Sequence, residues 1–404
     1  MYSPVLGGAE LHLKEISEGL AARGHEVTVL TTNTHNGWDL WNAIPGNFPA
    51  MESINGVQVV RLQPNGGTLG KLIRLCWDLP GGHRGLNWLL SPTGFDLFMQ
   101  GPRTFGVIPY LLSSNADVVA SMNWHWPLGH YCHLARRLKS YKLVGIPLFH
   151  TAEDWCGRDI YRRMLCNCDA VVTNTEFEAE FVRERGAQNV HALGVGIHPE
   201  DFEKRDGHAV RAAHHIGNHL VIGFIGRLTA NKGITTVIAA MRQVWKTNSE
   251  VRLLIAGPAL PADALDVLRL HELSLLERSR VIRICDFKEA DKASIFDAID
   301  VFVLPSVGES FGIAYLEAWM CGKPVIGADI GPTRDVIHDG VDGLLAKPDD
   351  PGDLAAKLLE LLSDSGKRER MGAKGKAKTL ARFTWKHIIG RMEQIYFELV
   401  AGPS

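Results

Sequence analysis

Short apolar runs alternate with amphipathic stretches along the chain, and this pattern predicts strands separated by helices. We expect strands near residues 26–32, 56–62, 117–122, 143–149, 169–173, 189–194, 221–226, 251–256, 281–285, 301–304, 324–327 and 343–346. The predicted helices between them include residues 9–23, 126–138, 176–185 and 234–245. Strands that alternate with helices are typical of parallel sheets wound with helices on both faces. The pattern therefore predicts an α/β protein with doubly wound sheets.

The length of 404 residues favours two domains or more. The polar stretch 199–218 is the best candidate for a boundary between them. We therefore expect an N-terminal domain in residues 1–205, a C-terminal domain in 206–384 and a final helix in 385–404. Two doubly wound domains that face a cleft would fit this division, and such sheets bind ligands at the carboxyl ends of their strands.

The most informative segment is 301–322, where two glutamates surround a glycine-containing loop that leads into a helix. We expect a buried strand up to Leu304 and a helix over residues 311–320, with Ser310 as its N-cap and Gly322 as its stop. A strand that feeds a helix through a tight loop leaves backbone N–H groups free at the positive end of the helix dipole. The segment therefore predicts an anion site.

Glu309 would lie at the mouth of this site, and Glu317 about two turns into the helix. Carboxylates do not favour phosphate, so these two are better suited to accept hydrogen bonds from the hydroxyls of a sugar and a ribose. The predicted ligand is a nucleotide sugar.

The two glutamates and the seven residues between them resemble the signature of the family-4 retaining glycosyltransferases of the GT-B fold. Further motifs follow in the family's order: Gly7-Gly8-Ala9-Glu10, Arg23-Gly24-His25-Glu26-Val27, Phe149-His150-Thr151, Gly226-Arg227, Asn231-Lys232-Gly233, Ile255-Ala256-Gly257 and Asp339-Gly340-Val341-Asp342-Gly343-Leu344. Each motif is weak alone, but the ordered set covers nearly the whole chain. The resemblance implies an acceptor-side domain followed by a donor-binding domain, with a last helix from Trp385 that returns to the first.

By this resemblance, Arg227 and Lys232 match the residues that bind the donor diphosphate, although such loop cations would otherwise be interpreted as solvated. Fixed positive groups and N–H donors stabilise the charge that develops on a departing diphosphate. The remaining donors would be the backbone amides of Gly7, Gly8, Ser310, Phe311 and Gly312.

The resemblance also gives roles to Glu317 at the ribose, and to Glu309 and His150 at the donor sugar. The apolar neighbours of Glu317 make its helix face look buried, so we expect a ligand or a cation beside this carboxylate. For His150, a polar residue satisfied within the fold is the alternative. The expected catalytic set is Glu309, His150, Arg227 and Lys232.

Seven of the ten tryptophans precede residue 160, in the expected acceptor-side domain. Trp124 and Trp126 follow a predicted strand directly and are the best candidates for an acceptor-sugar platform, with core packing as the alternative. The irregular region 64–115 is longer than a usual connection. It could cover an acceptor cleft or make a weak peripheral contact with a membrane.

Composition excludes several other classes. A net charge of −2 and the lack of an aromatic-basic module argue against nucleic-acid binding. No apolar run reaches the ~20 residues of a membrane-spanning helix, and no secretory signal stands at the start. Seven scattered cysteines, an odd number, indicate reduced thiols. We expect a cytoplasmic protein.

The chain contains no D-x-D pair, a motif with which many glycosyltransferases of the other major fold hold a divalent metal. Together with Arg227 and Lys232, this favours charge stabilisation by side chains and a helix dipole. We therefore expect no cofactor and no strict metal requirement. Retention of the anomeric configuration is implied by the resemblance alone.

One feature departs from the family, whose members carry an apolar strand before the glycine pair. Only residues 1–6 precede Gly7 here. Loss of a central strand would leave its neighbours without hydrogen-bond partners. We therefore expect that the chain begins downstream of the natural start, or that this domain is impaired.

The sequence thus predicts a retaining glycosyltransferase that moves a sugar from a UDP-, GDP- or ADP-linked donor to a hydroxyl of a glycan, a lipid or a small molecule. An epimerase or a phosphorylase of the same fold is an alternative, although no lysine stands out as an anchor for the pyridoxal phosphate of a phosphorylase. A non-catalytic protein that binds nucleotide sugars is the alternative outside enzymes.

Overall fold

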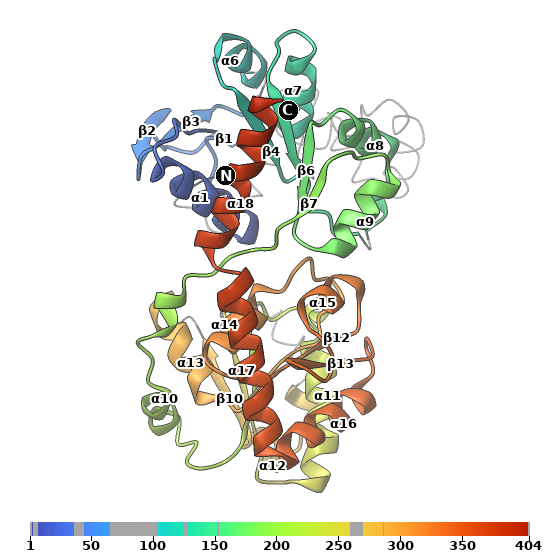
Figure 1. The fold of residues 1–404 in the computed structure, drawn as a ribbon. Coiled ribbons are helices and arrows are strands. Elements are labelled where there is room, and N and C mark those ends of the chain that lie inside the picture. Colours follow the sequence, from blue (N-terminus) through green and yellow to red (C-terminus); the bar gives the residue numbers. More distant parts are fainter. Residues whose placement is uncertain are drawn as a thin grey trace, which may run out of the picture. The chain divides into compact units, whose positions relative to one another are not determined.

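The computed structural model describes residues 2, 7–35, 44–64, 104, 106–124, 128–151, 153–258, 270–285 and 287–402. The chain divides into two compact units (Figure 1). Unit 1 comprises residues 1–194 and 385–404, and unit 2 comprises residues 195–384.

Two sheets form the centre of unit 1. The first has the order β1-β3-β2, in which β1 (Thr28–Thr32) runs parallel to β3 (Val57–Leu62) and β2 (Met51–Ile54) runs antiparallel to it. The second is parallel and contains β4 (Val118–Met122), β5 (Lys142–Ile146), β6 (Ala170–Thr173) and β7 (Val190–Ala192), in that order. Within the described ranges, β1 and β4 are both edge strands with a single neighbour.

The helices of unit 1 are α1 (Gly8–Ala21), α6 (Val107–Ser113), α7 (Leu128–Arg136), η2 (Asp154–Gly157), α8 (Asp159–Cys166), α9 (Glu176–Glu184) and α18 (Trp385–Ala401). The final helix α18 packs on α1 (Figure 1). Gly19 permits this contact, because a Cβ there would lie 2.2 Å from Cδ1 of Ile389. The ring of Trp385 meets His12 edge-on at 5.6 Å, and Arg23 pairs with Glu393 at 2.7 Å. These contacts attach α18 to unit 1.

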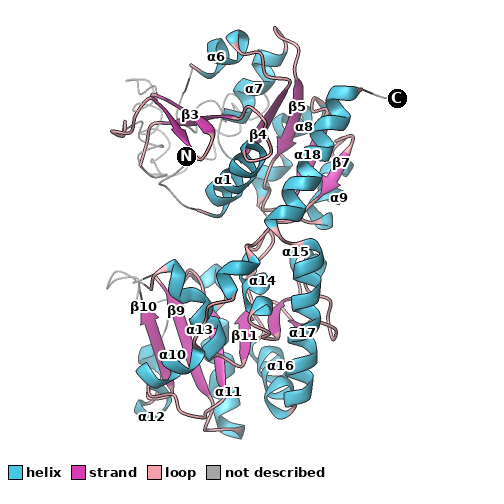
Figure 2. Ribbon diagram, turned by 60° about the vertical axis from the view of Figure 1, so that its left-hand side comes forward, coloured by secondary structure: helices cyan, strands magenta, loops and turns pink. Residues whose placement is uncertain are grey.

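Unit 2 is built on one parallel sheet, in which Figure 2 labels β10, β9 and β11. The full strand order of this sheet is β10-β9-β8-β11-β12-β13. Its strands are β8 (Val221–Ile225), β9 (Arg252–Gly257), β10 (Val281–Cys285), β11 (Val301–Leu304), β12 (Val325–Ala328) and β13 (Gly343–Ala346). All residues of β8, β11 and β12 are buried, as expected for apolar strands covered by helices on both faces. The strand order reverses between β8 and β11, and doubly wound sheets bind ligands at such a switch point.

The helices of unit 2 are η3 (Pro199–Phe202), α10 (Gly207–Ala213), η4 (Ala230–Lys232), α11 (Ile234–Thr247), η6 (Leu270–Glu272), α12 (Leu275–Arg278), η7 (Glu289–Asp291), α13 (Lys292–Ala298), α14 (Ile313–Met320), α15 (Gly331–Val336), α16 (Pro351–Ser363) and α17 (Ser365–Arg382). The long helices α16 and α17 pack against α11 and α14, respectively.

Every predicted strand is present to within a few residues. The sequence interpretation missed β2, which forms a hairpin with β3 through Asn55 and Gly56. Both of these residues have positive φ, 47° and 83°, as a two-residue type I′ turn requires. The Asn-Gly pair was the available signal.

The boundary between the units differs from the predicted one, because the chain joins unit 2 at Val195 rather than after residue 205. The N–H of Ile197 donates to the carbonyl of Phe383. Arg205 pairs with Asp297 at 3.1 Å. Residues 195–205 are therefore held to unit 2, although their polarity suggested a linker.

Candidate active site

Two loops meet at the switch point of unit 2, one after β8 and one after β11. The carbonyl of Asn231 accepts hydrogen bonds from the N–H of Val307 at 3.0 Å and the hydroxyl of Ser306 at 3.1 Å. Gly233 has φ 81°, and a Cβ there would lie only 2.4 Å from the carbonyl oxygen of Pro305. Glycine is therefore required where the two loops touch.

This contact brings Lys232 and Glu309 together. The Nζ of Lys232 lies 2.6 Å from Oε2 of Glu309, and both side chains are largely buried, with 15% and 10% of their surface exposed. Arg227 lies on the same loop as Lys232 and is exposed. In the part of the chain that the structure describes, no carboxylate pairs with Arg227. The site therefore offers one free guanidinium beside an ion pair.

The loop before α14 leaves backbone donors free. Within the described structure, the N–H groups of Ser310, Phe311 and Gly312 make no hydrogen bond. The helix begins at Ile313, so the predicted N-cap at Ser310 was wrong by two residues. Gly312 takes this position because its φ of 90° turns the chain into the helix. The predicted stop is correct, since α14 ends at Met320 and Gly322 has φ 71°.

The side chain of Phe311 does not face a ligand, because it is 3% exposed and meets the ring of Phe383 edge-on at 5.4 Å. Only its backbone amide could serve an anion. Three successive free N–H groups therefore lie at the start of a helix. Their loop contacts the loop that carries Arg227 and Lys232. This combination of amides and cations suits a phosphate group.

A cation lies beside the buried carboxylate of Glu317, as the sequence analysis expected. It is 8% exposed, and its Oε1 lies 2.5 Å from Nζ of Lys292, the first residue of α13. Burial works against the charged form of Lys292, but Glu317 and Glu289 outweigh it and raise its pKa. The sequence interpretation missed Lys292, because nothing local marks a lysine 25 residues before its partner.

His150 lies in unit 1, just after β5, and is exposed. The residue before it is fixed, because the N–H of Phe149 donates to Oε1 of Glu178 at 2.8 Å. The other oxygen of Glu178 accepts from the N–H of Asn174 at 3.0 Å. Burial raises the pKa of Glu178 from 4.5 to about 7, and these two bonds oppose the rise. The sequence analysis placed Glu178 in a helix but did not identify its hydrogen bonds to the backbone of Phe149 and Asn174.

The glycine pair opens α1, with Gly7 as its N-cap. The carboxylate of Glu10 folds back over this end, since a Cβ on Gly7 would lie 2.4 Å from its Oε2. Any anion that used the amides of Gly7 and Gly8 would therefore require Glu10 to move.

Trp124 does not offer a platform for a sugar. Its side chain is completely buried, and its Nε1 donates to the carbonyl and the hydroxyl of Ser121, each at 3.0 Å. It packs in the core with Phe149, at a ring distance of 6.0 Å. Core packing, the alternative interpretation, is therefore correct for Trp124. Trp126 lies outside the described residues.

The described ranges contain no group of three or more His, Cys, Asp or Glu side chains that could hold a metal ion. They also contain no helix that is long and apolar enough to cross a bilayer.

Comparison with known proteins identifies the family of this chain. Residues 209–378 match the family model of the glycosyl transferases group 1, and residues 7–196 match that of the glycosyl transferase 4-like domain. This chain is a group 1 glycosyltransferase. It is 31% identical over 300 residues to a D-inositol 3-phosphate glycosyltransferase of Stackebrandtia nassauensis, a match that covers 71% of this chain and 67% of the relative. A second such enzyme, from Xylanimonas cellulosilytica, is 29% identical over 96% of this chain and 91% of the relative.

Solved structures show that this glycosyltransferase has the GT-B fold. A sucrose-phosphate synthase from Thermosynechococcus elongatus matches with a TM-score of 0.74 and 22% identity, over 98% of this chain and 94% of that one. HepE from Anabaena, in complex with UDP and glucose, matches with a TM-score of 0.70 and 20% identity, over 98% and 97% of the two chains. The cradle of Arg227, Lys232 and the Ser310–Gly312 amides lies inside the group 1 match of this glycosyltransferase.

Proposed function

We propose that this glycosyltransferase transfers a sugar from a nucleoside diphosphate sugar to a hydroxyl acceptor, with retention of the anomeric configuration. The observation that carries the proposal is the cradle at the switch point, where three free N–H groups adjoin the loop that bears Arg227 and Lys232. A diphosphate needs both kinds of donor. Solved structures of the similar HepE contain UDP or UDP-glucose, which supports a donor of this class.

The cradle would stabilise the leaving group. When the bond from the anomeric carbon to the diphosphate oxygen breaks, its electron pair departs with the diphosphate. Arg227 has no competing carboxylate in the described part of the chain, so its guanidinium is available to this charge. The free amides of residues 310–312 would add donors that need no reorganisation. The departing phosphate would then take the proton of the acceptor hydroxyl as that oxygen forms the new glycosidic bond.

The two glutamates would orient the donor. Glu309 is held by Lys232 through one oxygen, which leaves its second oxygen for hydroxyls of the donor sugar. Glu317 is held in the same way by Lys292 and would accept hydrogen bonds from the ribose. His150 would contact the donor sugar near the scissile bond.

Ligand binding tests the cradle directly. We expect one of UDP, GDP and ADP to stabilise the protein by about 2.7 kcal/mol at 100 times its dissociation constant. Arg227→Ala should weaken that binding by about tenfold or more, because a charge-assisted hydrogen bond to phosphate is lost. The control is Lys374→Ala, which removes an exposed cation of α17 and should leave binding unchanged. Equal binding by the two variants would refute the cradle.

Turnover tests the catalytic part of the proposal. Wild-type protein should hydrolyse or transfer sugar from the donor whose nucleotide it binds, and Glu309→Gln should lower kcat strongly while nucleotide binding persists. Proton NMR of the product should show the anomeric configuration of the donor. Binding without any turnover by the wild type would instead support the non-catalytic alternative.

A further inference from the structure

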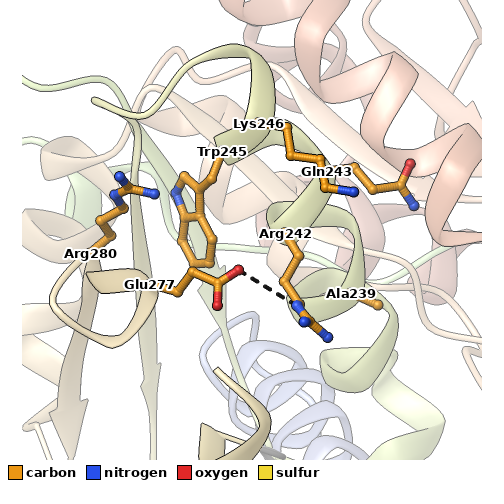
Figure 3. Close-up of a pocket in the computed structure, with 7 residues that line it drawn as sticks. All are labelled: Ala239, Arg242, Gln243, Trp245, Lys246, Glu277 and Arg280. Carbon is orange, nitrogen blue, oxygen red and sulfur yellow. Dashed lines mark ion pairs between the residues drawn. The ribbon is translucent and has the colours of Figure 1, made fainter. Parts of the chain in front are cut away.

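A pocket in unit 2 lies between α11 on one side and α12 with the residues that lead into β10 on the other (Figure 3). It has a volume of about 430 Å³ and is lined by Ala239, Arg242, Gln243, Trp245, Lys246, Glu277 and Arg280. This volume falls in the range of small-molecule sites.

The pocket lies at the opposite edge of the sheet from the cradle. Trp245, which lines the pocket, donates from Nε1 to the carbonyl of Val251, just before β9 begins. Arg280 directly precedes β10. The pocket therefore adjoins the amino ends of β9 and β10, whereas the cradle adjoins the carboxyl ends of β8 and β11. A ligand here would not occupy the donor site.

Positive charge dominates the pocket. Three cations line it, against the single carboxylate of Glu277. That carboxylate is already engaged, because Oε2 of Glu277 accepts from the N–H of Ser274 at 2.8 Å and Oε1 lies 3.6 Å from Nε of Arg242 (Figure 3). These contacts leave it no oxygen free of a partner. In the described part of the chain, no carboxylate pairs with Lys246 or Arg280.

The buried ring of Trp245 holds one of these cations in place. Trp245 is only 5% exposed, and the guanidinium of Arg280 lies over its ring, 5.9 Å from the ring centre. This contact orients Arg280, which lies on one side of the indole in Figure 3, while Arg242 lies on the other. Two guanidinium groups and an ammonium group around one hollow match the oxygens of a phosphate better than they match a single carboxylate.

We propose that this pocket binds a phosphate group of a small molecule or of a lipid headgroup, at a site separate from the donor site. The inference stands on the pocket alone and does not depend on the proposed transfer reaction. Phosphate would supply the negative charge that Glu277 cannot give to Lys246 and Arg280.

Calorimetric titration with glycerol 3-phosphate at constant ionic strength tests the soluble source. We expect binding that Lys246→Ala and Arg280→Ala each weaken by about tenfold, as loss of a charge-assisted hydrogen bond predicts. Lys374→Ala removes the same charge elsewhere in unit 2 and should change nothing. Arg227→Ala should also leave this binding intact, which separates the pocket from the cradle.

Vesicle sedimentation tests the lipid source. Vesicles of phosphatidylcholine with and without phosphatidic acid are compared for wild type, Lys246→Ala and Lys374→Ala. Binding to phosphatidic acid that only Lys246→Ala loses supports a headgroup as ligand. Because Arg280 packs on Trp245, Arg280→Lys serves as a variant that keeps the charge and should retain most of the binding. The proposal is overturned if neither probe binds, or if Lys246→Ala binds both as wild type does.

Discussion

The buried carboxylate of Glu178 should make the stability of unit 1 depend on pH in a way that a single substitution removes. Glu178 is 2% exposed and accepts two backbone N–H bonds. Burial raises its pKa from 4.5 to about 7. In the unfolded chain the pKa returns to the ordinary value, so the folded state binds more protons than the unfolded state between about pH 4.5 and 7.

The contribution of Glu178 to stability is fully present below pH 4.5 and is lost as the pH rises through about 7. A shift of this size corresponds to about 3 kcal/mol, at 1.36 kcal/mol per pKa unit. Glu178→Gln mimics the protonated side chain and cannot ionise. The substitution should therefore cost about 2.5 kcal/mol less at pH 8 than at pH 5, because the unfolded state has already begun to ionise at pH 5.

Urea unfolding of wild type and Glu178→Gln at pH 5 and pH 8 measures this difference. The matched control is Glu180→Gln on the same helix, where the glutamate is exposed and the cost should not change with pH. If Glu178→Gln costs the same at both pH values, the two N–H bonds fully compensate burial, and the reasoning is wrong. If Glu180→Gln shows the same pH dependence, the effect does not come from the buried site.

Two further predictions concern the stability of unit 2, and a third concerns the proposed reaction. Lys292→Ala should lower the free energy of unfolding by about 3–5 kcal/mol, because it leaves Glu317 buried without its cation; the double variant with Glu317→Gln should recover part of the loss. Gly233→Ala should destabilise more than Gly322→Ala in thermal unfolding, since both glycines have positive φ but only Gly233 would clash, with Pro305. Transferase activity should persist in EDTA, and its complete loss with rescue by Mg²⁺ or Mn²⁺ would contradict charge stabilisation by side chains, backbone amides and the helix dipole alone.

Much of the fold could be predicted because its signals are local. Runs of apolar residues marked the strands of both units, and Gly322 marked the end of α14 through a conformation that glycine adopts readily. The start of that helix was less certain from sequence, because Ser310 has the side chain of an N-cap. The turn at Gly312 instead delays the helix to Ile313. Local preference therefore predicted the helix α14, whereas the conformation of the preceding loop decided where this helix begins.

The sequence by itself determined the α/β class, the order of the elements and the family motifs, because periodicity and turn chemistry act over a few residues. Only the tertiary structure decided which charges meet. It joined Lys232 to Glu309 across 77 positions, gave Glu317 its partner in Lys292 and buried Trp124 in the core. The physical reason is that strand order brings distant loops to one edge of a sheet, and no local pattern encodes that order.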